Sequence, residues 1–211
     1  YNIRDNFLAD RLHKEIKNNA SIIFKNEFIE GLEDNLSKTI LNTSDGAAEF
    51  DLVIGADGRN SIIRELAAIN YSKKTYKESI LVTEINHSEP NNNTSFEIHR
   101  NGSLLTSVPT TNKKSAIVMI DSAEKIYNID PDNLNKIIHD GLSPYLGNTN
   151  VNNKYSIFPS ETIHAEKLYR NRVMLVGESA HVIPPIGAQG LNLGLRDIIT
   201  FYNLLLDRNA K

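Results

Sequence analysis

The stretch EFDLVIGADG, residues 49–58, decides the fold, because it joins a short apolar strand directly to a glycine-rich turn. Glycines permit tight backbone geometry that other residues resist. Ser61 is suited to cap the short helix that follows. Open α/β sheets bind ligands at the carboxyl ends of their strands, and a carboxylate there can accept hydrogen bonds from a sugar hydroxyl. Asp57 and Gly58 are therefore candidate binding residues.

A second strand–turn–helix unit fills the last forty residues. Residues 173–176 (VMLV) are continuously apolar, as is typical of a strand covered on both faces. The turn after them carries Glu178. An irregular segment with Pro185, Gly187 and Gly190 then leads into an amphipathic helix. The free N–H groups at the start of that helix favour a negative charge, such as an anionic ring or a phosphate.

Between these two units the pattern changes to the alternation of antiparallel strands. Asn101-Gly102 separates two alternating runs, which is a strong hairpin signal. Pro131 suits the first turn of a helix over about 132–140, and Gly141 and Pro144 indicate its end. Two α/β pieces therefore flank a mainly β insertion, so the sequence predicts a discontinuous α/β domain with a second domain inserted.

The composition excludes several classes of protein. The 211 residues are 40% hydrophobic and 23% charged, which is typical of a globular chain. No apolar run approaches the roughly 20 residues of a membrane-spanning helix. A net charge of −3 indicates no nucleic-acid partner. The chain has no cysteine, and its histidines, His181 left aside, show no metal-ligand spacing. No metal site is therefore expected.

Each turn also has an ordinary structural interpretation. Asp and Gly are frequent in turns after strands, and glycines beside prolines can simply shape a loop. His181 has the pKa range of a general base, but packing or hydrogen bonding within the fold explains it as well. Arg64 could pair with a phosphate or with a carboxylate.

Taken together, the two stretches resemble a known family. Residues 55–64 (GADGRNSIIR) look like the GADGxxSxxR motif of flavin-dependent aromatic hydroxylases, the group A FAD monooxygenases. Residues 176–181 (VGESAH) and 190–197 (GLNLGLRD) resemble their second FAD motif. The ending is most similar to the ubiquinone-biosynthesis branch of UbiH, UbiF and Coq6 type. The β-rich insertion between the motifs also fits.

The resemblance implies the fold in more detail. The expected fold is an incomplete FAD/NAD(P)-binding Rossmann-like domain in residues 1–70 and 161–211, with an inserted, mainly antiparallel substrate domain in residues 71–160. Two departures accompany it. Glu178 stands where the family usually has Asp, and no GxGxxG turn occurs in these residues. The chain therefore looks like the central and later part of such an enzyme, and alone it is expected to bind FAD poorly.

The resemblance also implies roles for individual residues. Family members reduce FAD with NAD(P)H and use O2, through a flavin C4a-hydroperoxide, to hydroxylate a phenol. Glu178 would hold a ribitol hydroxyl, and the amides of Leu191 and Asn192 would face the flavin O2/N1 edge. Pro185 would offer its carbonyl to the substrate phenol. The cofactor carries the hard step, so no catalytic side chain is assigned.

The cofactor-binding candidates are therefore Asp57, Gly58, Glu178, Gly187, Gly190, Leu191 and Asn192.

The implied substrate is a polyprenylated phenol or quinone precursor of ubiquinone. Such an enzyme would work in the cytoplasm, at the inner face of the membrane or in a ubiquinone-synthesis complex, without spanning the bilayer. Two alternatives remain open. One is a flavin hydroxylase of a soluble small phenol, and the other is a truncated, non-catalytic remnant or subunit.

Overall fold

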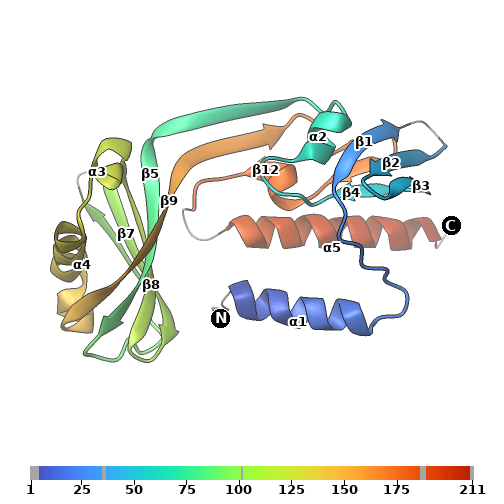
Figure 1. Ribbon diagram of the computed structural model, residues 1–211. Helices are drawn as coiled ribbons and strands as arrows, with labels where there is room; N and C mark the ends of the chain where they lie inside the picture. The colour runs from blue at the N-terminus through green and yellow to red at the C-terminus, as the bar shows by residue number, and fades with distance from the viewer. Residues whose placement is uncertain (1–4, 35–36, 101, 186–188, 210–211) are drawn as a thin grey trace. The chain divides into compact units, whose positions relative to one another are not determined.

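The computed structural model describes residues 5–34, 37–100, 102–185 and 189–209 (Figure 1). They divide into two compact units. The first comprises Tyr1–Phe24 and Tyr76–Ser160, and the second comprises Lys25–Thr75 and Glu161–Lys211. The long strands β5 and β9 carry the chain between the units, so each unit is built from separate parts of the sequence.

The first unit is built on an antiparallel sheet with the strand order β9-β5-β8-β7-β6. The short strand β12 (His181–Val182), which belongs to the second unit, pairs antiparallel with the end of β9 and is the sixth strand of this sheet. Two helices, α3 and α4, belong to the same unit (Figure 1). The bounds of these elements are β5 Tyr71–His87, β6 Phe96–Arg100, β7 Ser103–Thr111, β8 Lys114–Ser122, α3 Ala123–Tyr127, α4 Pro131–Leu146 and β9 Thr149–Ala165.

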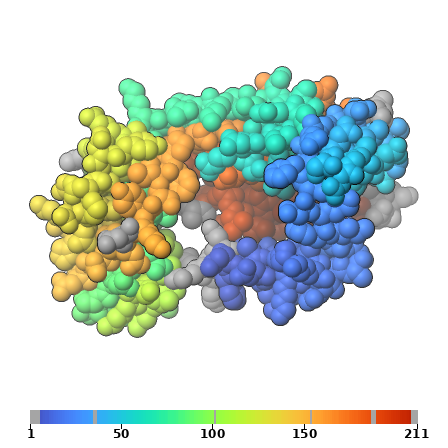
Figure 2. Space-filling model, in the orientation of Figure 1, coloured from blue at the N-terminus to red at the C-terminus, as the bar shows by residue number. Residues whose placement is uncertain are grey.

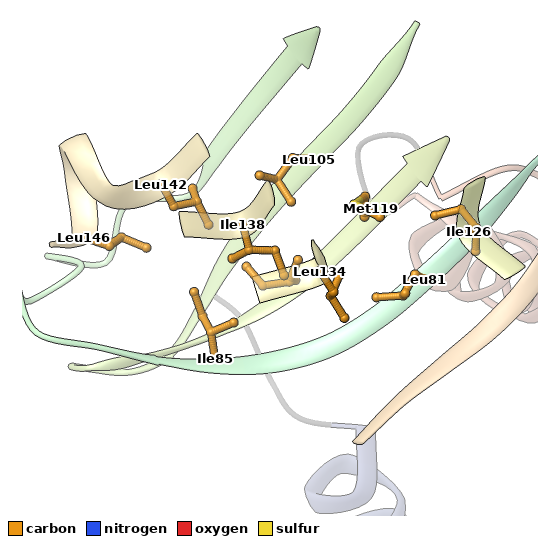
Figure 3. Close-up of a cluster of buried hydrophobic side chains, with 10 residues drawn as sticks. Leu81, Ile85, Leu105, Met119, Ile126, Leu134, Ile138, Leu142 and Leu146 are labelled. Atoms are coloured by element: carbon orange, nitrogen blue, oxygen red, sulfur yellow. The ribbon is translucent and has the colours of Figure 1, made fainter. Parts of the chain in front are cut away.

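The core of this unit lies between the sheet and helices α3 and α4. Figure 3 shows the apolar side chains of both layers pointing toward one another, with Ile85 from β5 and Leu105 from β7 facing the helical residues Ile138 and Leu142. Alternate positions of the strands are buried, as a half-covered sheet requires. The alternation of apolar and polar residues in the middle of the sequence is therefore explained by a sheet that helices cover on one face.

The predicted hairpin is confirmed, because β6 and β7 pair antiparallel on either side of Asn101-Gly102. The predicted end of the helix is wrong: α4 continues through Gly141 and Pro144 to Leu146. A Cβ at Gly141 would come 2.6 Å from Leu105 Cδ2, so glycine allows α4 to approach β7 closely. The complete burial of Leu142 and Leu146 explains why the last turn continues past Pro144.

The first unit also contains helix α1 (Asp5–Asn18). It appears in dark blue at the surface in Figure 2, and its apolar residues Phe7 and Leu12 are exposed. Residues 21–24 form no strand, although three of them, Ile22, Ile23 and Phe24, are apolar in succession. Ile23, at 84% exposed, has no sheet to pack on there.

The second unit contains a parallel strand pair. Strand β11 (Val173–Leu175) pairs parallel with β4 (Val53–Gly55) and antiparallel with β10 (Tyr169–Arg170). A separate antiparallel sheet has the order β1-β2-β3. Its strands span Ile29–Asp34, Thr39–Thr43 and Gly46–Phe50, and the remaining elements are α2 Ile62–Leu66, the short 3₁₀ helix η1 Gly177–Ser179, β12 His181–Val182 and α5 Gly190–Asn209.

A compact core holds the parallel strands in place. Val53, Ile63, Val173 and Leu175 are buried together and fix α2 against β4 and β11. By contrast, the apolar stripe of α5 is exposed in the part of the chain that the structure describes. The core therefore lies at the strands that lead into the two glycine-rich turns.

The predicted α/β class is confirmed, with sheets that are mainly antiparallel. The boundaries 1–70, 71–160 and 161–211 stay a prediction. Within the described residues, no helix is long and apolar enough to cross a membrane. The same residues contain no group of three or more His, Asp or Glu side chains arranged to hold a metal ion.

Candidate functional site

The two glycine-rich turns follow neighbouring parallel strands. Leu175 at the end of β11 lies in register with Gly55 at the end of β4, and the N–H of Val176 donates to the Gly55 carbonyl at 3.0 Å. The Ser179 hydroxyl is 2.6 Å from the same carbonyl. The sequence therefore placed both turns correctly at the carboxyl ends of strands, and the structure adds that the turns are joined to each other. Strand β4 is buried on one face only, because Ile54 is 46% exposed.

The first turn is shaped by its glycines. A Cβ at Gly55 would lie 2.9 Å from both Ile63 Cγ2 and Leu175 Cδ2, so a larger residue would collide with the core. Gly58 has a φ of +83°, a left-handed conformation that favours glycine. No atom lies within 4 Å of a Cβ built on Gly58, so this position faces open space.

Asp57 organises this turn from within. Its Oδ1 accepts from the Ser61 hydroxyl at 2.6 Å, and its Oδ2 accepts from the N–H of Ile63 at 3.1 Å. Ser61 in turn caps α2 by accepting from the N–H of Arg64. Each carboxylate oxygen has a further lone pair, so Asp57 can shape the turn and still accept another hydrogen bond.

Among the described residues, no carboxylate pairs with Arg64. Its side chain is 1% exposed and donates to two backbone carbonyls, those of Ser179 at 2.9 Å and Arg59 at 3.0 Å. Its guanidinium also lies 4.1 Å from the centre of the Tyr71 ring, which provides a cation–π contact. Arg64 therefore links the two turns through their backbones.

Glu178 of the second turn is paired with Arg59 of the first. Arg59 Nε is 3.2 Å from Glu178 Oε2, and Arg59 Nη2 is 3.2 Å from Glu178 Oε1, a two-pronged contact. Arg59 Nη1 also lies 3.7 Å from Glu161, whose carboxylate lies 2.8 Å from Lys73 Nζ. Two acids and two bases thus form a connected, charge-balanced group beside the turns.

The second turn is fastened to α5. Gly177 has a φ of +62°, and a Cβ at Gly194 would lie 3.2 Å from Gly177 Cα, so two glycines allow the helix and the turn to approach closely. Asp197 Oδ2 accepts from the N–H of Gly177 at 2.9 Å and lies 2.7 Å from His181 Nε2. The start of α5 is therefore held beside η1.

The first turn of α5 presents backbone donors. The N–H of Leu193 bonds back to the Gln189 carbonyl, whereas the first N–H groups of a helix have no acceptor within the helix itself. Gly190, Leu191 and Asn192 are exposed, and a Cβ at Gly190 would meet no atom within 4 Å.

Two further residues were predicted from the sequence to belong to this site, Pro185 and Gly187. Pro185 is exposed. Gly187 lies outside the described residues. The structure thus brings together Asp57, Gly58 and Glu178 on the joined turns, and it places Gly190, Leu191 and Asn192 on the helix fastened to the second turn.

Sequence reasoning missed the residues that connect the two motifs. Arg59, Glu161, Ser179 and Asp197 received no role, although three of them lie inside the quoted motifs. The available signal was charge: Arg59 is basic and Glu178 acidic. That signal becomes useful only when the two turns are known to be neighbours.

Joined parallel strands, glycine turns at their carboxyl ends and a helix start beside them are typical of α/β domains that bind a nucleotide cofactor. The chain belongs to the FAD binding domain family, whose match covers residues 7–207.

Two related sequences are compared with this chain first, and one solved structure after them. An uncharacterized protein of Synechocystis is 30% identical over 149 residues, which are 69% of this chain and 36% of the relative. The 3-demethoxyubiquinol 3-hydroxylase of Escherichia coli is 26% identical over 162 residues, 75% of this chain and 41% of the relative. The chain thus spans about two fifths of the length of these relatives.

Among solved structures, the p-nitrophenol 4-monooxygenase of Pseudomonas putida shares the fold. Its TM-score is 0.69 at 15% identity, over 90% of this chain and 50% of that chain.

The residues present fit the flavin end of FAD. Open space at Gly58 and Gly190 leaves room for a ligand against the backbone. The first turn of α5 offers N–H donors for a ring edge that carries negative charge, and Glu178 offers a half-exposed carboxylate for hydroxyl groups. These are the kinds of donor and acceptor that an isoalloxazine ring and its ribityl chain require.

Proposed function

We propose that the protein containing this chain is an FAD-dependent monooxygenase that hydroxylates the aromatic ring of a polyprenylated phenol or quinone precursor in ubiquinone biosynthesis. One observation carries the flavin part: the two glycine turns end neighbouring parallel strands, and Asp197 holds the start of α5 beside them. The name of the Escherichia coli relative supports the substrate class.

FAD, when bound, supplies the redox chemistry with NAD(P)H as reductant and O2 as oxidant. One oxygen atom enters the substrate as a hydroxyl group, and the other leaves as water while NAD(P)H is oxidised. The protein's task is then to bind, to orient and to stabilise charge. Asp57 shapes the first turn, Gly58 and Gly190 allow close approach, and Glu178 accepts hydrogen bonds from the ribityl hydroxyls.

The start of α5 has the electrostatic role. The N–H groups of Leu191 and Asn192 stabilise negative charge on the reduced ring, because preorganised donors cost no rearrangement when the charge develops. Pro185 offers its carbonyl to the substrate phenol and orients the ring. In this proposal residues 71–160 form the substrate domain, and residues 1–70 and 161–211 contribute to the FAD domain.

The proposed substrate determines where the enzyme works. A polyprenyl tail is insoluble in water, so the enzyme collects its substrate in the cytoplasm at the inner face of the membrane, or from a ubiquinone-synthesis complex that shields the tail. Burying apolar surface contributes about 25 cal/mol per Å², so each buried isoprenoid unit adds substantially to affinity. A tailed substrate is therefore preferred.

The test uses the complete protein that contains this chain. Its kcat/KM is measured with a prenylated phenol and with the same phenol lacking the tail, and hydroxylated product is quantified against NAD(P)H consumed. We expect a large preference for the tailed substrate and restoration of quinone in a ubiquinone-deficient hydroxylase mutant. Equal turnover of both phenols without restoration would favour a soluble substrate, and flavin binding without any hydroxylation would favour a non-catalytic role.

A further inference from the structure

We propose that Arg59 is a positioning residue for Glu178: it holds the carboxylate where it accepts hydrogen bonds from the ribityl chain of a bound flavin. The proposal rests on the proposed function, because it assigns the ribityl chain to Glu178. It assigns a residue of the first motif, Arg59, to flavin binding by a residue of the second motif, Glu178.

The contact between the two side chains has the geometry of a clamp. Nε and Nη2 of Arg59 each lie 3.2 Å from a different oxygen of Glu178. A guanidinium fork that contacts both oxygens fixes the plane of the carboxylate, whereas a lysine ammonium acts as a single point of charge. Each oxygen keeps another lone pair for a hydroxyl donor.

Arg59 is itself held from two sides. Its Nη1 faces Glu161, which is 6% exposed and lies 2.8 Å from Lys73 Nζ. Its backbone carbonyl accepts from the buried guanidinium of Arg64 at 3.0 Å. The side chain of Arg59 is 35% exposed, and that of Glu178 is 49% exposed. The clamp is thus anchored on its inner side, and the carboxylate is open on its outer side.

The length of the Glu178 side chain explains why a clamp would favour binding. Glutamate has one more rotatable bond than aspartate, and a half-exposed side chain loses rotamer freedom when a ligand fixes it. Because the guanidinium already holds the carboxylate before the ligand binds, less side-chain conformational entropy is lost on binding. The same pair could also serve only to join the two turns, so the experiment must separate positioning from stability.

The experiment compares two flavin probes on the flavin-free form of the complete protein. Riboflavin carries the ribityl hydroxyls, and lumiflavin has the same ring without them. Binding is followed by quenching of flavin fluorescence for the wild type, Arg59→Met, Arg59→Lys, Glu178→Gln and the Arg59→Met/Glu178→Gln double variant. Lys38→Met is the matched control, because it removes a basic side chain from an exposed ion pair with Asp51 in the same unit.

We expect Arg59→Met to weaken riboflavin binding by about tenfold, because it frees a charged hydrogen-bond acceptor to move. Lumiflavin binding should change by less than about twofold, and Arg59→Lys should lie between the wild type and Arg59→Met. In the Glu178→Gln background, Arg59→Met should add little further loss. The control should bind both probes as the wild type does, and circular dichroism should show all variants folded.

Two results would overturn the inference in distinguishable ways. If Arg59→Met weakens both probes equally or neither, while the wild type binds flavin, Arg59 has a purely structural role and the proposed function stands. If the wild type binds no flavin in any form, the proposed function fails and the inference fails with it.

Discussion

His181 Nε2 lies 2.7 Å from Asp197 Oδ2, the same oxygen that accepts the backbone N–H of Gly177. The two side chains are 18% and 16% exposed, so the contact is largely shielded from water. One carboxylate oxygen on α5 therefore holds the second turn at two points. This relationship gives His181 a structural partner.

Replacing Asp197 should loosen the second turn. Asp197→Ala leaves the Gly177 N–H and the His181 ring without their acceptor, which we expect to cost about 1–3 kcal/mol of unfolding free energy. Asp197→Asn keeps one oxygen acceptor and should cost less. Denaturant unfolding checks this, with the exposed Asp207→Asn on the same helix as control. An Ala variant as stable as that control would contradict the role of Asp197.

The contact also predicts the behaviour of a His181 variant. If His181 only braces the turn, His181→Gln should reduce stability slightly and change kcat by less than about tenfold. Loss of a general base would instead lower kcat by about 10²–10⁴-fold. Steady-state turnover of the complete protein, with its flavin content measured in parallel, separates the two. A kcat loss beyond a hundredfold at full flavin content would make His181 catalytic.

The packing around Gly55 predicts a steric effect. A methyl group there would lie 2.9 Å from Ile63 Cγ2 and Leu175 Cδ2, both within the core of the second unit. We expect Gly55→Ala to destabilise the protein by about 1–3 kcal/mol, which is typical of overpacking. Gly190→Ala, where the added carbon meets open space, is the matched control and should change the stability little. Thermal and denaturant unfolding measure both, and equal stability would refute the steric argument.

The cap of α4 predicts an acid-sensitive contribution to stability. The N–H of Asn133 donates to Asp130 at 2.9 Å, and this hydrogen bond lowers the pKa of the Asp130 carboxyl below its ordinary value of 3.8. A lowered pKa in the folded state means that the contribution is present above pH 3.8 and is lost as the pH falls through the folded pKa. Asp130→Asn keeps a capping oxygen that does not titrate, so its stability should fall less steeply in acid. Unfolding curves at several pH values test this, and parallel losses in both proteins would contradict it.

The sequence predicted the strands, the turns and the binding residues to different degrees. Val53 and Val173 lie in short apolar runs that end in glycine, and this local pattern was enough to place both turns. The length of α4 was not predictable from its Gly141 and Pro144, because burial against β7 decides it. The Arg59–Glu178 pair spans 119 positions of sequence, so only folding brings its charges together.

Glu178 carries the sharpest prediction for the cofactor. Its carboxylate follows a buried strand and stands beside the first glycine turn, held by Arg59. In the complete protein, Glu178→Ala removes a charged acceptor from the ribityl hydroxyls. A hydrogen bond to a charged group contributes roughly 1.5–3 kcal/mol, so FAD affinity should fall by about one to two decades.

Glu178→Asp keeps the charge on a stem one methylene shorter and should bind FAD much more tightly than the Ala variant. Flavin titration by fluorescence quenching measures all three proteins, and Glu97→Ala, which removes an exposed carboxylate paired with His99 on β6, serves as control. If Glu178→Ala retains the affinity of the wild type, Glu178 is a surface charge that joins two turns. The ribityl hydroxyls must then find their acceptor elsewhere, and Asp57, with a free lone pair on each oxygen, becomes the next residue to test.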